Sequence, residues 1–191
     1  MSSETAKPTY TSSEQITDWT IDAAHSTFEF AVRHMRVSTV KGAFSGVTGE
    51  IRFDPTDLKS SWVRAEIDMS TVDSHNAGRD EALRSERHFD VANYPTATFA
   101  SKRIEPRPDG TFDVIGDLTL RGVTREVTFH TTFDGIQRTP TDSFRGAFTA
   151  QTTIKRSDFG FSAGTPLPGG GFTTSDEVEL TMHTSINPKE G

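Results

Sequence analysis

The sequence predicts an all-β domain, an eight-stranded antiparallel β-barrel with a short helical insertion. The clearest observation is the segment 112–130, in which two alternating runs meet at Arg121-Gly122, as in a β-hairpin. Successive side chains of a strand point to opposite faces. One face of the first run is therefore apolar and carries Phe112, Val114, Gly116, Leu118 and Leu120. The same alternation recurs along the chain, and no reactive motif lies beside it.

Four strands are expected in the N-terminal half, at 19–21, 27–35, 44–53 and 62–69. In the second of these strands, Phe28, Phe30, Val32 and His34 share one face. Gly42, Gly46 and Gly49 suggest bulges or sharp coiling, which a closed sheet needs. The run Asp54-Pro55-Thr56-Asp57 indicates a turn.

Residues 76–87 break the alternation, because they are mostly helix formers and include no β-branched side chain. One helix is expected there, or two short ones that end by Ala92. Further strands are expected at 96–103, 111–120, 124–133, 143–154 and 174–186. The glycine- and proline-rich stretch 155–171 is expected to be a long loop with a small turn of helix. A β-sandwich remains the alternative way to close these strands.

The chain has 191 residues, which suits one domain. We expect a disordered tail over 1–17, the barrel over 18–187 and a C-terminal tail over 188–191. Phenylalanine, at 14 residues, far outnumbers tyrosine, at 2, which favours a dry interior.

The formal net charge of −7 gives no electrostatic attraction to nucleic acid, so no nucleic-acid partner is expected. The lack of cysteine excludes disulfides and thiolate metal sites. Neither a signal peptide nor a run of about 18 apolar residues is visible, so we expect a cytoplasmic protein without stable membrane insertion. A homodimer is left open.

Short motifs follow one another in a fixed order along residues 18–187. They are Trp19-x-Ile21-Asp22-x-x-His25-Ser26, Phe30-x-Val32-x-His34, Gly42-x-Phe44, Gly49-x-Ile51, Arg79-Asp80 ahead of Leu83, Phe89-Asp90-Val91, Tyr94-Pro95-x-x-x-Phe99-x-Ser101, Gly116-x-Leu118-Thr119-Leu120-x-Gly122-Val123-Thr124 and Arg156-Ser157-Asp158-Phe159-Gly160. Together they resemble the YceI-like family of lipocalin-like polyisoprenoid-binding proteins.

The resemblance implies an eight-stranded antiparallel lipocalin-like barrel with a helical insertion. It also implies an apolar tunnel for an isoprenoid chain, such as a polyprenyl or quinone tail, and no catalytic activity. The chain departs from the family pattern at Gly164–Phe172, a glycine- and proline-rich loop at the rim of the implied tunnel. The family often carries a signal peptide, which this sequence does not show.

Other polar groups carry weaker signals. The six histidines lack metal-ligand spacing, so no metal site is expected. Asp22 with His25-Ser26 is interpreted as a turn in preference to a catalytic dyad, because adjacent side chains point apart. Gly169-Gly170-Gly171 lacks the lysine of a phosphate loop. The pair Arg79-Asp80 is interpreted as a surface charge pair, with a headgroup phosphate site as the alternative.

We therefore predict non-catalytic binding of a polyisoprenoid or other long-chain lipid, for transport, storage or sequestration, with no further cofactor. The predicted lining residues are Phe30, Val32, Phe44, Phe99, Leu118, Leu120, Phe129 and Phe148, with His34 as a polar contact. Two alternatives stay open: an enzyme acting on a lipid or quinone with His34 as acid or base, and a structural or stress-response module with a packed interior.

Overall fold

The computed structural model describes residues 17–162 and 164–189. Its strands are β1 (Asp18–Ile21), β2 (Thr27–His34), β3 (Ser38–Phe44), β4 (Val47–Arg52), β5 (Trp62–Asp68), β6 (Val72–Asp73), β7 (Thr96–Pro106), β8 (Phe112–Leu120), β9 (Val123–Arg138), β10 (Phe144–Lys155) and β11 (Thr174–Pro188). The helices are α1 (Ala77–Arg84) and three short 3₁₀ turns, η1 (Ala23–His25), η2 (Met69–Thr71) and η3 (Arg156–Phe159).

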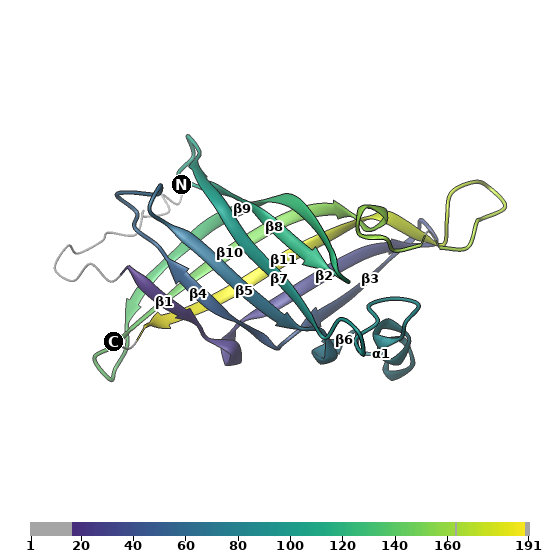
Figure 1. The fold of residues 1–191 in the computed structure, drawn as a ribbon, viewed down its shortest axis with the longest axis horizontal. Helices are drawn as coiled ribbons and strands as arrows, with labels where there is room; N and C mark the ends of the chain where they lie inside the picture. The colour runs from purple at the N-terminus through teal and green to yellow at the C-terminus, as the bar shows by residue number, and fades with distance from the viewer. Residues whose placement is uncertain (1–16, 163, 190–191) are drawn as a thin grey trace, which may run out of the picture.

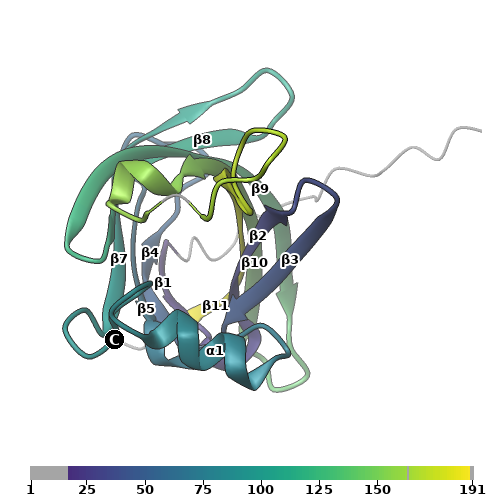
Figure 2. The ribbon, with the colours of Figure 1, turned by 90° about the vertical axis from the view of Figure 1, so that its right-hand side faces the viewer.

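Eight strands form a closed antiparallel ring in the order β1-β4-β5-β7-β8-β9-β10-β11, completed by the pairing of β1 with β11. This confirms the predicted barrel and excludes the sandwich. Strands β2, β3 and β6 extend the sheet from β11 (Figure 1). Figure 2 views the barrel from one end, with α1 along the lower edge of that end and η3 with the loop after it along the upper edge. The β2–β3 hairpin reaches the same end (Figure 1).

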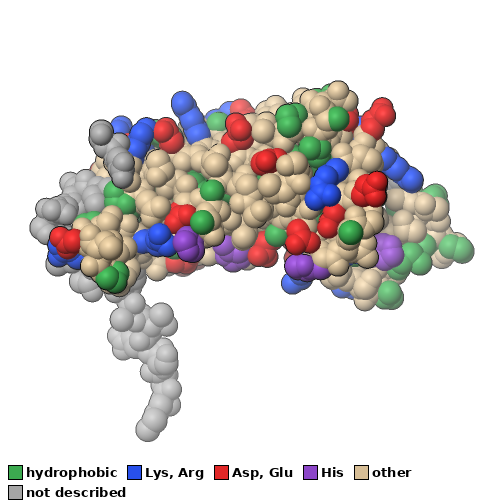
Figure 3. All heavy atoms as spheres, turned by 90° about the horizontal axis from the view of Figure 1, so that it is seen from below, with side chains coloured by type: hydrophobic (Ala, Val, Ile, Leu, Met, Phe, Trp, Pro, Cys, Tyr) green, Lys and Arg blue, Asp and Glu red, His purple; other side chains and the backbone are tan. Residues whose placement is uncertain are grey.

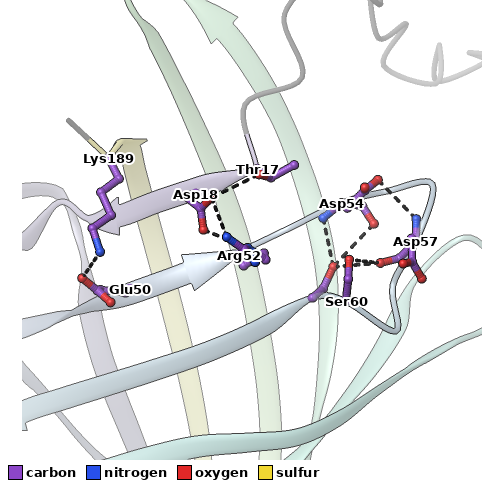
Figure 4. A network of polar contacts seen from close by, with 9 residues as sticks. Thr17, Asp18, Glu50, Arg52, Asp54, Asp57, Ser60 and Lys189 are labelled. Atoms are coloured by element: carbon purple, nitrogen blue, oxygen red, sulfur yellow. Dashed lines mark hydrogen bonds and ion pairs between the residues drawn. The ribbon is translucent and has the colours of Figure 1, made fainter. Parts of the chain in front are cut away.

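The ring closes where β1 lies between β4 and β11. Trp19 pairs with Ile51 on one side, and Ile21 pairs with Ile186 on the other. Beside this seam the Arg52 guanidinium donates from Nε and Nη2 to the two carboxylate oxygens of Asp18, both at 2.9 Å (Figure 4). Such an exposed pair contributes little, because water screens it, so closure depends mainly on the backbone ladder and the buried side chains.

The hairpin β2–β3 is the main departure from the predicted strands. Residues 38–44 form β3, which pairs along the whole of β2, and β4 begins separately at Val47. The stretch was not predicted as a strand because Gly42 occupies an inward position where alternation calls for an apolar side chain. A Cβ on Gly42 would lie 2.4 Å from the Phe30 ring, so the ring takes the place of a side chain there.

The predicted role of the glycines as bulges is wrong at two positions. Pairing runs without a register shift through Gly42 and Gly49. Gly49 has φ +153°, and a Cβ there would lie 2.1 Å from the carbonyl oxygen of Arg64. These glycines let neighbouring groups approach closely. In the part of the chain that the structure describes, the irregularities lie between Ser101 and Arg103, between Ala147 and Phe148, and between Thr174 and Val178.

Other boundaries differ by a few residues. The helix is shorter than 76–87: Asn76 caps its N-terminus by accepting from the Arg79 backbone N–H, and Ser85 is already extended. Strand β9 runs on to Arg138, beyond the predicted strand at 124–133. The expected turn of helix in 155–171 is η3.

The predicted tails fall mostly outside the described residues. Of the stretch 1–17 only Thr17 is described, and its carbonyl accepts from the Phe53 N–H at 2.8 Å. At the other end, β11 includes Pro188, and the Lys189 N–H donates to the Asp18 carbonyl at 2.9 Å. The ordered barrel therefore extends through Lys189.

Candidate functional site

The inside of the barrel holds an apolar cavity of about 90 Å³, part of which opens to solvent. Its walls come from strands all around the ring. Most of the lining is hydrophobic: Ile21, Phe28, Ile51, Phe53, Val63, Ala65, Ile67, Phe99, Ile104, Phe112, Val114, Leu118, Phe129, Phe148, Ala150 and Met182. The volume is below the roughly 300–1,000 Å³ that is usual for small-molecule sites, because aromatic rings fill part of the lumen.

The cavity has few polar groups. Arg52, Trp62, Thr131 and Thr184 complete the lining. The Thr131 hydroxyl donates to the carbonyl of Phe129 at 3.2 Å, so its proton is held by its own strand. The Arg52 guanidinium is engaged with Asp18 (Figure 4). The interior therefore favours a hydrocarbon over a polar ligand, because a buried polar group without a partner costs free energy.

Four of the nine predicted site residues line this cavity: Phe99, Leu118, Phe129 and Phe148. Phe30, Phe44 and Leu120 are buried in the core but not among the lining residues. Val32 is partly buried, and His34 is exposed at the end of β2. Contact of these residues with a ligand stays a prediction.

Sequence reasoning missed several lining residues, notably Phe28, Phe53 and Phe112. Phe28 shares a face of β2 with Phe30. The Phe30 ring lies over Gly42 and 5.9 Å from Phe44 between ring centres, whereas Phe28 lines the cavity. Phe53 follows the last residue of β4, next to a turn, where alternation no longer indicates direction.

Rings crowd one end of the cavity around Phe53. Its centre lies 4.9 Å from that of Phe133, 5.1 Å from Phe148 and 5.8 Å from Phe112. The rings are tilted, edge-on or offset, which are favourable aromatic geometries. They narrow the lumen at the end where β4 and β9 finish.

A second group of rings crowds the end covered by α1. Phe44 lies 6.1 Å from Phe28, and Phe89 meets Phe44 edge-on at 5.5 Å. Phe161 then meets Phe89 edge-on at 5.7 Å, and the Arg121 guanidinium lies 6.0 Å from the Phe161 ring centre. We call Phe89 and Phe161 the plug. Both are only partly buried and belong to connecting segments, so they can move more easily than strand residues.

Cations surround the plug. Burial lowers the pKa of His88, and the nearby guanidinium groups of Arg156, Arg87 and Arg121 lower it further. Arg156 donates to the Ser162 carbonyl at 2.8 Å, and Arg121 donates to the Glu86 carbonyl at 2.8 Å. Burial also lowers the pKa of Arg156. Within the described residues, no carboxylate lies within 4 Å of these three guanidinium groups.

Arg79 and Asp80 do not form the predicted surface charge pair, because both side chains hydrogen-bond to Ser74. Asp80 is buried and accepts from the Ser74 N–H at 2.8 Å and from its hydroxyl at 2.5 Å. These hydrogen bonds hold the pKa of Asp80 below its usual range. Arg79 donates to the Ser74 hydroxyl and carbonyl, both at 2.8 Å. Together they fix the segment that leads into α1.

The structure supports a turn at Asp22. One carboxylate oxygen accepts from the Ala24 N–H at 3.1 Å, and the other lies 2.9 Å from His25 Nδ1. The Ser26 hydroxyl donates to the Ser185 carbonyl at 3.3 Å and accepts from the Ser185 N–H at 3.0 Å. These bonds tie Ser26 to β11 and leave no dyad with His25.

Two observations concern metal binding and membrane insertion. Over residues 17–162 and 164–189, no three His, Cys, Asp or Glu side chains gather as a metal site would need. Among the same residues, no helix has the length and hydropathy needed to cross a bilayer.

Comparison with known proteins gives a consistent result. The YceI-like domain family matches residues 19–186. A UPF0312 protein of Vibrio vulnificus is 34% identical over 168 residues, covering 87% of this chain and 85% of that protein. A UPF0312 protein of Vibrio cholerae is 35% identical over 168 residues, with the same two coverages of 87% and 85%.

Solved structures share the fold. BcnA of Burkholderia cenocepacia superposes with a TM-score of 0.74 at 27% identity, covering 86% of this chain and 98% of BcnA. The YceI protein of Campylobacter jejuni gives a TM-score of 0.71 at 27% identity, covering 83% and 90%. A polyisoprenoid binding domain from Saccharophagus degradans gives 0.67 at 16% identity, covering 90% and 98%, a likeness of fold alone.

Proposed function

Because the chain belongs to the YceI-like family, we propose that it binds a polyisoprenoid, such as a polyprenyl or quinone tail, or another long-chain lipid inside its barrel. The observation that carries the proposal is the cavity within the ring, which is lined almost entirely by apolar side chains. A fold neighbour described as a polyisoprenoid binding domain supports the same class of ligand. The role is carriage, storage or sequestration of the lipid without chemical change.

The cavity volume limits how much of a chain the barrel holds. With the side chains as they stand, a cavity of about 90 Å³ does not hold a long chain, so entry of a polyprenyl tail requires rings of the lumen to move aside. Each methylene that is then buried contributes about 0.8 kcal/mol, against about 4–15 kcal/mol lost on association.

Nothing in the described residues favours the enzymatic alternative. A general acid or base must reach the reacting group, whereas His34 is exposed on the β2–β3 hairpin and is not among the cavity-lining residues. The packed-interior alternative is disfavoured by the cavity itself.

The test is uptake by the purified protein, measured by native mass spectrometry and lipid extraction. Prenols of about 15, 20, 25 and 45 carbons are offered, and affinity should rise with chain length until the cavity is filled. Ala150→Phe places a ring in the cavity and should abolish uptake. The matched control is Ala147→Phe on the same strand, at a residue that is not among the cavity-lining set.

Circular dichroism checks that both variants fold. A wild-type barrel that contains no lipid and takes up none of the prenols would contradict the proposal. Equal uptake by the two variants would place the ligand elsewhere on the molecule.

A further inference from the structure

Exposed apolar side chains gather at one tip of the molecule. Five large hydrophobic side chains are exposed over residues 17–162 and 164–189, and three of them lie at this tip: Met35 at 43%, Val37 at 81% and Phe172 at 46%. Met35 and Val37 are in the turn of the β2–β3 hairpin, and Phe172 is in the loop before β11. Scattered exposed hydrophobics are normal, but a cluster marks an interaction surface.

Hydrogen bonds join the two segments into one surface. The Met35 N–H donates to the Thr173 carbonyl at 2.8 Å, and Arg36 Nη1 donates to the Gly170 carbonyl at 3.3 Å. Figure 1 shows both segments at the same end of the barrel, with the loop as the outermost part of the molecule. Figure 3 shows hydrophobic side chains at that end. We call Met35, Val37 and Phe172, with Arg33 and Arg36, the apolar tip.

The charge of the tip is opposite to that of the chain. The sequence has 27 acidic residues, yet residues 33–41 and 159–175 contain none, whereas 33–41 includes Arg33 and Arg36. The guanidinium of Arg33 donates to the Thr39 hydroxyl at 3.0 Å and to the Arg36 carbonyl at 3.1 Å, so neither bond neutralises it.

One carboxylate does face the tip. Asp176 lines a shallow groove with Arg33, Arg36 and Phe172, but it accepts from the Ser157 N–H at 2.9 Å and from the Ser157 hydroxyl at 2.7 Å. Within the part of the chain that the structure describes, Arg33 and Arg36 form no ion pair.

We propose that the apolar tip docks on the surface of an anionic lipid bilayer. Apolar side chains flanked by arginine suit the boundary between lipid headgroups and acyl chains. Anionic headgroups attract Arg33 and Arg36 and repel the rest of a chain whose net charge is −7, which orients the tip toward the bilayer. Docking of this kind is peripheral and places the α1 end of the barrel near membrane lipids.

The inference rests on the proposed function only for the reason why docking would be useful, which is to bring the barrel near membrane lipids. Docking itself is measured without any isoprenoid. Vesicles of phosphatidylcholine with about 30% phosphatidylglycerol are sedimented with the protein at low salt, beside vesicles of phosphatidylcholine alone. The wild type should cosediment with the anionic vesicles, and binding should weaken as salt rises.

Two variants separate the contribution of the apolar side chains to vesicle binding from that of the two arginines. Met35→Ser/Val37→Ser/Phe172→Ser should weaken vesicle binding by about a hundredfold, because it removes the apolar anchors. Arg33→Gln/Arg36→Gln should weaken binding to anionic vesicles by about tenfold or more and remove most of the salt dependence.

Matched controls lie elsewhere on the surface. Ile136→Ser changes an exposed side chain, at 38%, on β9. Arg64→Gln/Arg138→Gln lowers the charge by the same two units away from the tip. Both controls should bind vesicles as the wild type does.

Absence of wild-type binding to anionic vesicles, or equal binding by tip variants and controls, would overturn the inference. Concentration-dependent self-association that the tip substitutions abolish, without vesicle binding, would assign the tip to a second copy of the chain and also overturn it. Prenol uptake by the tip variants is measured separately, so loss of docking with intact uptake leaves the proposed function standing.

Discussion

The guanidinium of Arg121 lies 6.0 Å from the centre of the Phe161 ring, at the α1 end of the barrel. Phe161 contacts Phe89, which contacts Phe44 in the core, so a chain of rings leads from the surface toward the lumen. The first two rings belong to connecting segments and the third to β3. Under the proposed function, Phe89 and Phe161 are the rings of this row expected to move when a lipid exchanges at this end, because they lie outside the strands.

Removing the outer ring should speed lipid exchange. Phe161→Ala opens the plug without disturbing the strands, and release of a bound prenol should become several-fold faster, with the free energy of unfolding changed by about 1 kcal/mol or less. Release is followed by transfer of a fluorescent prenol analogue to acceptor vesicles. The control is Phe144→Ala on β10, whose ring also lies 6.0 Å from a guanidinium, that of Arg138. Equal release from both variants would show that exchange does not pass the plug.

The rings at the opposite end should matter for both stability and capacity. Phe53 is buried and contacts Phe112, Phe133 and Phe148, so Phe53→Ala should lower the free energy of unfolding by about 3–5 kcal/mol. Phe172→Ala, at an exposed ring, should change it by about 0.5 kcal/mol or less. Urea unfolding measures both.

The same substitution enlarges the lumen. If Phe53→Ala folds, the prenol length at which affinity stops rising should increase by a few carbons relative to the wild type. An unchanged length limit would place the bound chain away from these rings.

The sequence predicted this architecture where one face of a strand is clearly apolar. In the hairpin of β8 and β9, alternation placed Leu118 and Phe129 correctly in the lumen. The same rule failed at β3, because Gly42 contributes no side chain to its inward position and Phe30 from β2 covers it. Alternation identifies which face of a strand is buried. Whether a buried ring packs in the core or lines the cavity depends on its orientation, and that orientation is set by neighbours far apart in sequence.

The helical end of the barrel was the least predictable. Arg79 and Asp80 are adjacent in sequence and oppositely charged, yet both bind Ser74. The plug depends on Phe89 and Phe161, which come together only after the barrel closes. No local pattern encodes such contacts, because they connect loops that are separated by most of the C-terminal half.

Stability should fall on mild acidification because of His88. Burial lowers its pKa, and three nearby arginines lower it further, so the folded state holds the neutral ring. A histidine whose pKa is lower in the folded state stabilises the fold above its unfolded pKa, about 6.5, and that contribution is lost as pH falls below this value. The urea midpoint should therefore decrease between about pH 7.5 and 5.5, and less so in His88→Gln.

The control is His75→Gln, whose side chain is 92% exposed. It should keep the pH dependence of the wild type. A His88→Gln profile parallel to that of the wild type would assign the acid sensitivity to other groups.

Gly42 and Phe30 should be energetically coupled. A Cβ at Gly42 would lie 2.4 Å from the Phe30 ring and 3.1 Å from the Asp73 carbonyl oxygen. Gly42→Ala forces the ring out of its position against Phe44, and the free energy of unfolding should fall by about 1–3 kcal/mol. Phe30→Leu alone should cost about 1–2 kcal/mol, because it removes ring contacts from the core.

In the double variant the smaller side chain leaves room for the new methyl group, so the combined cost should be smaller than the sum of the two by about 1 kcal/mol or more. Urea unfolding of the four proteins of this double-mutant cycle gives the coupling energy directly. Strictly additive costs would mean that the backbone of Asp73, and not the Phe30 ring, is what excludes a side chain at Gly42. A favourable coupling would establish that the ring of Phe30 takes the place of the missing side chain in β3.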